Sequence, residues 1–397
     1  MKLLRLISSL DASGGGPIEG ARRIDKEIAR LGHQVEVACL DAPAQAGHDA
    51  YPATVHALGP AKLGYRYSAA LLPWLRANRQ RFDAVIVDGL WQYQGLAAWR
   101  ALAGTDTPYF VFTHGMLSPW FKYTYPLKHL KKWLYWPWAD YRLLRDAHAV
   151  LFTCDEERRL ARQSFWLYKA REDIASLGTE RPPQDNDGQL KAKFRSTWPE
   201  TAGKRILLFL GRMHPVKGCD LLIDAFAQVA TTDPSLHLVM AGPDQTGWAA
   251  TLKQQAQRLG MADRITWTGM LQGDAKWGAF HAAEVFCLPS HQENFGIVVA
   301  EALGCGKPVL ISDKVNIWRE IEADGAGIVR SDTVEGTVDA LRTWLALSPE
   351  AQDRVRDAGQ QCFENRYRIE RVAADLVDII ARHIGPGASK MGTGSTP

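Results

Sequence analysis

"VFCLPSHQENFGIVVAEALGCGKPVLISD" occupies residues 285–313 and holds two apolar runs on either side of a short helical pattern. The runs VFCLPS and PVLISD are rich in Val, Ile, Leu and Phe with little alternation, as in strands buried on both faces of a parallel sheet. Apolar residues from Ile297 to Leu303 have helical spacing, so a helix is predicted to begin at Phe295–Gly296 and to end near Gly304. A strand, a helix and a second strand in one short stretch favour an α/β fold.

Similar strand-like runs recur along the chain, and segments long enough for helices separate them. They lie at 3–10, 35–40, 84–89, 109–115, 149–154, 205–211, 236–242, 265–269, 285–290 and 308–313. Alternating strands and helices favour doubly wound parallel sheets, and a chain of 397 residues is too long for one ordinary core. The predicted fold class is therefore α/β, with two Rossmann-like parallel-sheet domains that face each other across a cleft.

Composition sets the predicted domain boundaries. The polar segment 181–203 is rich in Pro, Gly and Asp and is predicted to be a linker between domains over 1–180 and 204–363. A helical pattern over 364–384 is expected to pack back towards the N-terminal domain. The tail 385–397 is expected to be disordered.

Composition also excludes several classes of protein. A net charge of only +3 argues against a dedicated nucleic-acid binder, so no nucleic-acid partner is expected. The six cysteines are scattered without a C-x-x-C pair, which favours neither a zinc site nor a disulfide framework. The D-x-D at 185–187 lies in the polar linker and not behind a buried strand, so no metal site is predicted there. Because no apolar run approaches the roughly 20 residues needed to span a bilayer, and Arg5 interrupts the N-terminal run, a cytoplasmic protein is expected.

Two cations follow the strand at 205–211, at the end of the strand where ligands bind in open α/β sheets. Arg212 and Lys217 lie in the loop that leads to a helix starting near Gly218. Two cations beside a helix N-terminus can clamp a diphosphate. Taken alone, they are better explained as ordinary surface cations.

The quoted stretch adds two carboxylates to these cations. The backbone amides of Phe295, Gly296 and Ile297 at the predicted helix start form a candidate anion site. Glu293 precedes this site, and Glu301 lies about 7.5 Å along the helix axis from Gly296. A nucleoside diphosphate sugar has hydroxyls at both ends of an anionic middle, so one carboxylate is predicted to bind the sugar and the other the ribose.

Three residues of the N-terminal half also end predicted strands. His114 follows the run YFVFT, and Asp88 and Trp91 lie in VDGLWQYQG. A lone histidine is more often structural than catalytic, and His114 lies at the mouth of the predicted cleft. Asp88 and Trp91 are predicted to shape the acceptor pocket.

The spacing of these residues resembles that of a known family. G-R-x4-K-G at 211–218, followed by E-x7-E from Glu293 to Glu301, is similar to the retaining glycosyltransferases of family four, which have the GT-B fold. The resemblance covers almost the whole chain and is strongest over 205–330. It implies that Arg212 and Lys217 neutralise the diphosphate of the donor, that Glu301 holds the ribose and that Glu293 touches the transferred sugar.

The resemblance also assigns roles in the N-terminal half. It implies that Gly15 and Gly16, in the glycine-rich loop after the first strand, approach the donor phosphates, and that His114 lies near the reacting sugar. The catalytic residues predicted in this way are His114, Glu293, Arg212 and Lys217. The predicted donor site adds Gly242, Met270, Leu271, Asn294, Phe295, Gly296, Ile297 and Glu301 to the residues named for the phosphates.

The implied reaction is transfer of a hexose with retention of the anomeric configuration. No cofactor or metal is expected, because the two cations and the helix start take the place of a metal ion at the leaving diphosphate. The expected donor is GDP-mannose or a UDP-hexose, and the expected acceptor is a glycan or a polyprenyl-diphosphate-linked glycan of bacterial exopolysaccharide, O-antigen or capsule assembly. Two alternatives stay open: a nucleotide-sugar epimerase or hydrolase, and a non-catalytic nucleotide-sugar-binding protein.

The segment 120–138, WFKYTYPLKHLKKWLYWPW, holds eight aromatic residues and four lysines but no acidic residue. Aromatic rings and lysines together favour the interface of an anionic membrane, here the inner face of the cytoplasmic membrane. A helix that buries its aromatic side chains inside the N-terminal domain explains the segment equally well. The candidate membrane contacts are Trp120, Phe121, Lys128, Lys131, Lys132, Trp133 and Trp136.

Overall fold

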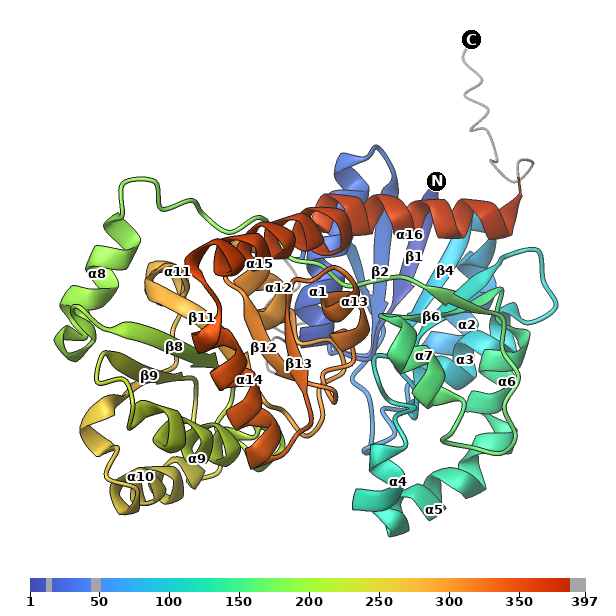
Figure 1. The fold of residues 1–397 in the computed structure, drawn as a ribbon. Helices are drawn as coiled ribbons and strands as arrows, with labels where there is room; N and C mark the ends of the chain where they lie inside the picture. Colours follow the sequence, from blue (N-terminus) through green and yellow to red (C-terminus); the bar gives the residue numbers. More distant parts are fainter. Residues whose placement is uncertain (12–15, 44–50, 386–397) are drawn as a thin grey trace. The chain divides into compact units, whose positions relative to one another are not determined.

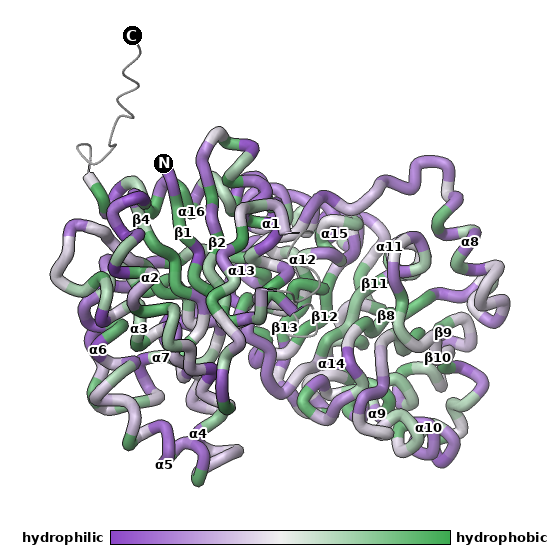
Figure 2. The backbone as a smooth tube through the Cα atoms, turned by 180° about the vertical axis from the view of Figure 1, so that it is seen from behind, coloured by the Kyte–Doolittle hydropathy of each residue, from purple (hydrophilic) through white to green (hydrophobic). Residues whose placement is uncertain are grey.

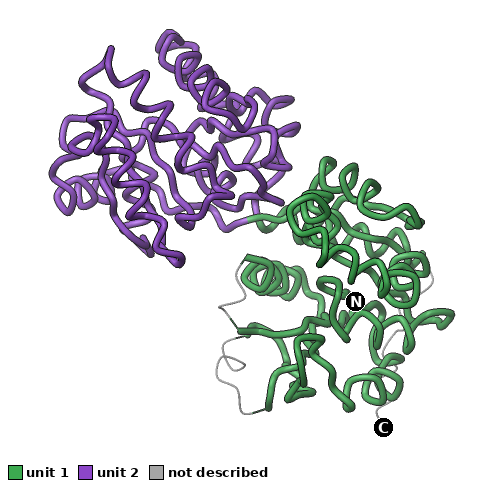
Figure 3. Tube along the Cα trace, turned by 90° about the horizontal axis from the view of Figure 1, so that it is seen from below, with its two compact units in different colours: residues 1–178, 369–397 green, residues 179–368 purple. Residues whose placement is uncertain are grey.

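The chain divides into two compact units in the computed structural model, which describes residues 1–11, 16–43 and 51–385. Unit 1 comprises Met1–Gly178 and Ile369–Pro397, and unit 2 comprises Thr179–Arg368 (Figure 3). Each unit contains one fully parallel sheet flanked by helices (Figure 1). The prediction of two parallel-sheet α/β domains is therefore confirmed.

Unit 1 has a seven-stranded sheet in the order β3-β2-β1-β4-β5-β6-β7. Its strands are β1 (Lys2–Leu6), β2 (Gln34–Cys39), β3 (Thr54–Ala57), β4 (Ala84–Asp88), β5 (Tyr109–Phe112), β6 (Ala149–Phe152) and β7 (Glu172–Ile174). Its helices are α1 (Gly16–Arg30), α2 (Leu71–Asn78), α3 (Tyr93–Leu102), α4 (Trp120–Thr124), α5 (Pro126–Tyr135), α6 (Asp140–Asp146), α7 (Asp155–Ala161) and α16 (Ile369–Ile384), with 3-10 turns at Arg79–Arg81 and Trp136–Trp138.

The central strands of unit 1 bury both of their faces. Side chains alternate between the two faces of a strand, and Leu4 and Val85 belong to one apolar cluster while Leu3 and Ile86 belong to another. In the hydropathy colouring of Figure 2, the apolar stretches accordingly follow the strands, for example β1 and β2. This double burial explains why the strands read as continuous apolar runs and not as alternating ones.

The last helix of the chain completes unit 1. One stripe of α16 is buried, and it packs against α1 and the same face of the sheet as Leu3 and Phe110. Full burial of one aliphatic side chain stabilises a fold by about 1.5–3 kcal/mol, so the helix is an integral part of this core. The buried residues of α16 are Ile369, Val372, Ala373, Leu376, Val377, Ile379 and Ile380.

Unit 2 has a six-stranded sheet in the order β10-β9-β8-β11-β12-β13. Its strands are β8 (Arg205–Leu210), β9 (Leu236–Ala241), β10 (Ile265–Gly269), β11 (Ala283–Leu288), β12 (Val309–Ser312) and β13 (Gly327–Arg330). Its helices are α8 (Gln189–Thr197), α9 (Cys219–Ala230), α10 (Trp248–Arg258), α11 (Gly273–Ala282), α12 (Ile297–Gly304), α13 (Trp318–Ala323), α14 (Val334–Ala346) and α15 (Pro349–Cys362). 3-10 turns lie at Pro199–Thr201, Pro215–Lys217 and Ala262–Arg264, and a π-helical turn lies at Phe363–Tyr367.

The segment 181–203 differs from the predicted linker, because it contains α8 and belongs to unit 2. Phe194 of α8 is buried, and the helix packs closely against α11 at Gly278. A Cβ atom at Gly278 would lie 2.5 Å from the carbonyl oxygen of Leu190, so only glycine permits this approach. The D-x-D also has a structural role here, since Asp185 accepts hydrogen bonds from the backbone N–H groups of Leu190 and Lys191 at 2.8 and 2.9 Å.

Three strands escape the sequence prediction, namely β3, β7 and β13. All three lie at the edges of their sheets and have only three or four residues, so they show little apolar pattern. The predicted helix after residue 293 is α12, and Gly296 is its N-cap residue. Among the described residues, no helix is both long enough and apolar enough to span a membrane.

Candidate functional site

The strand order of unit 2 reverses between β8 and β11, which are neighbours in the sheet. Ligands in open α/β sheets bind at such a point, beyond the carboxyl ends of the strands. The loop after β8 carries Lys217, and the loop after β11 carries Glu293. The Nζ atom of Lys217 forms an ion pair with Oε2 of Glu293, so the structure brings these two predicted site residues together.

Backbone contacts hold the two loops against each other. The backbone N–H of His291 and the hydroxyl of Ser290 both donate to the carbonyl oxygen of Val216, at 2.8 and 2.9 Å. Gly218 has a positive φ of 65°, and a Cβ atom there would lie 2.0 Å from the carbonyl oxygen of Pro289. Glycine is therefore required where the start of α9 meets the end of the β11 loop.

The start of α12 presents backbone N–H groups with no side chain of the N-cap residue to cap them, because that residue is Gly296. Gly296 has a positive φ of 73°, and the first turn of the helix contains no acidic residue. Phe295 is buried and makes an edge-to-face contact with Tyr367, which fixes the turn before the helix. A helix start of this kind carries a partial positive charge and favours an anion.

Glu301 lies in the same helix and is almost fully buried, with 3% of its surface exposed. Its Oε1 atom forms an ion pair with Nζ of Lys276 at 2.6 Å, while its Oε2 atom is buried and has no hydrogen-bond partner among the described residues. Lys276 comes from α11 and lies 4.5 Å from the centre of the Trp277 ring. Lys276 is not among the residues predicted from the sequence, although it is the only charged residue in the run AKWGAF, residues 275–280.

Arg212 follows β8 but does not join the Lys217–Glu293 pair. Its side chain is exposed and forms no hydrogen bond or ion pair with any residue of the described ranges. The remaining residues predicted around the helix start lie next to it: Asn294 accepts a hydrogen bond from Asn316 at 3.3 Å, and Ile297 is the first residue of α12.

A pocket of about 500 Å³ lies at the carboxyl ends of β9 and β10. Gly242 and Met270, two of the predicted donor residues, line it, whereas Leu271 is buried and is not among its lining residues. A Cβ atom at Gly242 would lie 1.8 Å from the carbonyl oxygen of Gly211, so glycine allows the β8 and β9 loops to meet. The other lining residues are Met213, Met240, Pro243, Asp244, Ala249, Lys253, Trp267, Thr268 and Gly269.

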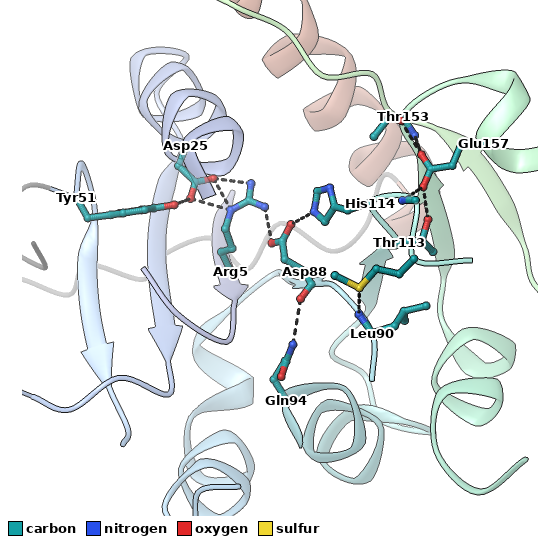
Figure 4. Close-up of polar contacts among 12 residues, drawn as sticks. Arg5, Asp25, Tyr51, Asp88, Leu90, Gln94, Thr113, His114, Thr153 and Glu157 are labelled. Atoms are coloured by element: carbon teal, nitrogen blue, oxygen red, sulfur yellow. Dashed lines mark hydrogen bonds and ion pairs between the residues drawn. The ribbon is translucent and has the colours of Figure 1, made fainter. Parts of the chain in front are cut away.

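In unit 1, the strand order reverses between β1 and β4, and a chain of buried polar contacts lies there (Figure 4). Arg5 of β1 donates to both carboxylate oxygens of Asp25 at 2.6–2.9 Å and to Oδ2 of Asp88 at 2.7 Å. Oδ1 of Asp88 lies 2.7 Å from Nε2 of His114, and the hydroxyl of Tyr51 donates to Asp25 at 2.8 Å. The structure thus brings together the predicted residues Asp88 and His114, and it adds Arg5, Asp25 and Tyr51.

The charges in this network determine the direction in which the pKa of Asp88 shifts. Burial alone would raise the pKa of its carboxyl group, but Arg5 and His114 together hold that pKa below its usual value. The side chain of His114 is only 6% exposed, and its Nδ1 atom has no hydrogen-bond partner among the described residues. His114 also has a positive φ of 47°, which is strained for a residue with a side chain.

A second buried carboxylate fixes the turn that carries His114. Glu157 accepts hydrogen bonds from the Thr113 hydroxyl at 2.7 Å and the Gly115 backbone N–H at 2.5 Å, and its other oxygen accepts two from Thr153 (Figure 4). Glu157 is not among the residues predicted from the sequence, because no local pattern links a glutamate of α7 to the ends of β5 and β6.

The other residues predicted in unit 1 are Trp91, Gly15 and Gly16. Trp91 packs its ring against Trp136 and Phe165, so it contributes to an aromatic core. Gly16 is the first residue of α1, and Gly15 lies outside the described residues. The backbone N–H of Trp91 donates to Asp140 at 3.2 Å.

The candidate membrane contacts divide into two groups. Trp136 is fully buried, and Trp133 and Lys132 pack inward against Phe165 and Trp91, so the assignment of Trp136 to a membrane surface is wrong. Trp120 and Phe121 are partly buried in α4, whereas Lys128 and Lys131 are exposed. Trp133 and Trp136 face the interior because they pack against the apolar cluster that contains Phe165.

Two family models match the chain. "Glycosyl transferases group 1" matches residues 191–361, and "Glycosyl transferase 4-like domain" matches residues 15–178. D-inositol 3-phosphate glycosyltransferase 2 of Catenulispora acidiphila is 31% identical over 55% of this chain and 53% of its own length. D-inositol 3-phosphate glycosyltransferase of Nocardia farcinica is 27% identical over 64% of this chain and 58% of its own length. The chain thus matches just over half the length of these two relatives.

Solved structures share the fold at low sequence identity. HepE of Anabaena in complex with UDP superposes with a TM-score of 0.77 at 18% identity, over 96% of this chain and 99% of that one. WaaG, a glycosyltransferase involved in lipopolysaccharide biosynthesis, gives a TM-score of 0.64 at 18% identity over 96% and 99% of the two chains. With both family models matched in sequence and both sheets in place, the chain belongs to the group 1 glycosyl transferases and has the GT-B fold.

Proposed function

We propose that this chain transfers a hexose from a nucleoside diphosphate sugar to an acceptor hydroxyl, with retention of the anomeric configuration and without a metal ion. The observation that carries the proposal is the Lys217–Glu293 ion pair beside the uncapped start of α12. Structures of Anabaena HepE with UDP, with UDP and glucose, and with UDP-glucose support a UDP-hexose as the donor. GDP-mannose is the alternative donor.

Binding of the diphosphate would rearrange the ion pair. Lys217 can exchange the carboxylate of Glu293 for a phosphate oxygen, while Arg212 is exposed and available as the second cation. The exchange releases Glu293 to accept a hydrogen bond from a hydroxyl of the sugar. The N–H groups at the start of α12 add further donors for the phosphate.

Glu301 is proposed to bind the ribose. Its Oε2 atom is buried without a partner among the described residues, which is costly unless a ligand hydroxyl donates to it. Lys276 holds the other oxygen at 2.6 Å and so acts as a positioning residue for this carboxylate. The pocket beside Gly242 and Met270 is proposed to take the base.

In the proposed reaction, the bond between C1 of the sugar and the β-phosphate oxygen breaks, and its electron pair leaves with the nucleoside diphosphate. A bond forms between C1 and the acceptor oxygen on the same face of the sugar. The acceptor proton passes to an oxygen of the departing phosphate. The charge that develops on the diphosphate is stabilised by Arg212, Lys217 and the start of α12.

His114 is proposed to contact the transferred sugar, with Asp88 as its positioning residue. The hydrogen bond between Asp88 and Nε2 fixes the ring, and Glu157 fixes the backbone turn. A ring held in this way loses little conformational freedom when the sugar binds.

The acceptor is proposed to be a glycan or a polyprenyl-diphosphate-linked glycan of bacterial exopolysaccharide, O-antigen or capsule assembly. The two named relatives are D-inositol 3-phosphate glycosyltransferases, and WaaG is involved in lipopolysaccharide biosynthesis, so acceptors differ between similar proteins. The exposed lysines of unit 1 at positions 122, 128 and 131 support a lipid-linked acceptor at the inner face of the cytoplasmic membrane.

The first test is a thermal-shift panel of nucleoside diphosphates and their sugars in the presence of EDTA. We expect selective stabilisation by UDP and UDP-hexoses that Lys217→Ala abolishes, while Lys193→Ala, which removes an exposed lysine of the same unit, retains it. Failure of every nucleotide to stabilise the protein, or a strict need for a divalent ion, would contradict the proposed donor site.

A second test separates the alternatives. Product analysis by NMR is expected to show the same anomeric configuration in the donor and the glycoside. Donor consumption that is independent of any acceptor would favour a hydrolase or an epimerase. Donor binding without turnover on any glycan or lipid-linked acceptor would favour a binding protein.

A further inference from the structure

Helix α5 has two apolar faces, and only one of them is buried. Phe165 stacks on His129 and Trp136, with ring centres 4.8 and 4.2 Å apart, and also contacts Trp133. At about 100° per residue, Leu127, Leu130 and Leu134 lie roughly 100–160° around the helix from His129, the buried residue of α5. We call these three residues the leucine face; they are 82%, 60% and 75% exposed.

The leucine face has no explanation within unit 1. A helix on a protein surface needs one apolar stripe, which faces the core, and its outer side is normally polar. Here the inner stripe is already satisfied by the aromatic cluster around Phe165. An ordered row of exposed leucines at helical spacing therefore indicates a surface that contacts something apolar.

The charged side chains of the segment 120–138, which carries the leucine face, are all of one sign. Lys122, Lys128 and Lys131 are exposed, and none of them forms an ion pair within the described part of the chain. The segment 120–138 contains no Asp or Glu to compensate them. Further exposed aromatic residues lie close in sequence or in space, namely Tyr123, Trp138 and Trp166, which stacks on Trp133.

We propose that α4 and α5 form a docking surface for an anionic lipid bilayer. The leucine face enters the boundary between headgroups and acyl chains, and the three lysines contact lipid phosphates. A second copy of this chain is a poor occupant, because it would bring the same uncompensated lysines against these. A bilayer provides both the apolar depth for leucine and a dense negative surface for lysine.

The docking surface lies close to the part of unit 1 that is proposed to bind the sugar and the acceptor. Lys132 on the inner side of α5 lies 4.4 Å from the centre of the Trp91 ring, and Trp91 lies in the loop after β4, which ends at Asp88. The docking surface therefore lies at the end of unit 1 where β1 and β4 terminate (Figure 1). Presentation of a lipid-linked acceptor there rests on the proposed function, whereas binding to the bilayer does not.

The test is flotation of the full chain with vesicles of phosphatidylcholine, with and without phosphatidylglycerol. We expect the chain to bind the mixed vesicles, with binding that weakens as salt is added. Replacing the leucine face by Leu127→Gln, Leu130→Gln and Leu134→Gln should weaken binding at least about tenfold. Replacing Lys122, Lys128 and Lys131 by Gln should weaken binding to the mixed vesicles about tenfold, so that the preference for phosphatidylglycerol is lost.

The matched control is Leu31→Gln with Leu63→Gln, which removes two exposed leucines elsewhere in unit 1 and should leave vesicle binding unchanged. Light scattering and UDP binding are measured on each variant. Unaltered vesicle binding after loss of the leucine face would overturn the proposal, and so would failure of the native chain to bind mixed vesicles. A dimer that the leucine variant dissociates would identify a second copy as the occupant instead. Because UDP binding is read separately, a failure of the donor site is distinguishable from a failure of this surface.

Discussion

Unit 1 and unit 2 change their strand order at equivalent places, between β1 and β4 in one and between β8 and β11 in the other. In unit 1, Arg5 is buried and bonded to both Asp25 and Asp88, so the charges there satisfy one another. In unit 2, Arg212 is exposed and unpaired among the described residues, and one oxygen of Glu301 has no such partner. The same topology thus holds charges that are paired with one another in unit 1, which we call the closed network. In unit 2 it holds charged groups that lack at least one partner among the described residues and can bind a ligand, which we call the open network.

The largest effect is expected from breaking the closed network. Arg5→Met should destabilise unit 1 by about 3–5 kcal/mol, because it leaves Asp25 and Asp88 buried without their cation. Denaturant unfolding followed by tryptophan fluorescence measures the loss. The control Arg171→Met removes an exposed arginine of the same unit and should change little. Equal stability of the two variants would show that the network is not a structural element.

Breaking the open network should cost binding and not stability. Lys217→Ala should weaken UDP binding about 100-fold, since the variant leaves Glu293 unpaired next to the diphosphate. Calorimetric titration measures the affinity, and the melting temperature without ligand should stay close to that of the native chain. A large drop in that melting temperature would place Lys217 with the structural charges instead.

Asp140 differs from the paired charges of unit 1, because it is a buried carboxylate without an ion pair to any described residue. Burial raises its pKa to about 7, against weaker opposing contributions from the Trp91 N–H and Lys132. The folded state then keeps a proton that the unfolded state has lost, so stability is complete below the ordinary carboxyl pKa and declines as pH rises towards 7.

We therefore expect the native chain to lose about 2 kcal/mol of stability between about pH 5 and pH 8 through this group. Asp140→Asn should remove that loss, whereas Asp106→Asn, which changes an exposed aspartate, should not. Unfolding free energies at the two pH values measure the slope. An unchanged slope in Asp140→Asn would show that another group titrates.

The smallest effect is expected from the positioning lysine of unit 2. Lys276→Met should weaken UDP binding about tenfold, because Glu301 loses the ion pair that orients it. The informative measurement is the affinity ratio between UDP and 2′-deoxy-UDP. This ratio should fall in the variant if Glu301 binds the ribose, and a preserved ratio would assign Lys276 to the structure of α11 alone.

The sequence predicts the parts of this molecule that have a local signal. Apolar runs predict the central strands, and the motif from Glu293 to Glu301 predicts the start of α12 and the family. The Lys217–Glu293 contact follows from the topology, since parallel strands place their carboxyl ends at one edge of the sheet. The roles of these residues stay predictions until the donor is measured.

Contacts between distant residues have no such signal. Arg5 interrupts an apolar run, which shows that it is unusual, but its partners Asp25 and Asp88 lie 20 and 83 positions away. Lys276 and Glu157 escape for the same reason. The error in 181–203 has a different cause, since α8 is a mostly exposed helix whose polar composition resembles that of a linker.

Because α16 follows every element of unit 2 in the chain, synthesis of unit 1 begins before that of unit 2 and ends after it. All of unit 2 emerges from the ribosome before α16, the helix that covers Leu3, Ile24 and Phe110. Unit 2 can therefore complete its core during translation, while the nascent unit 1 keeps an uncovered apolar surface that attracts chaperones. A premature stop between unit 2 and α16 would accordingly damage unit 1, although its other elements had already been synthesised.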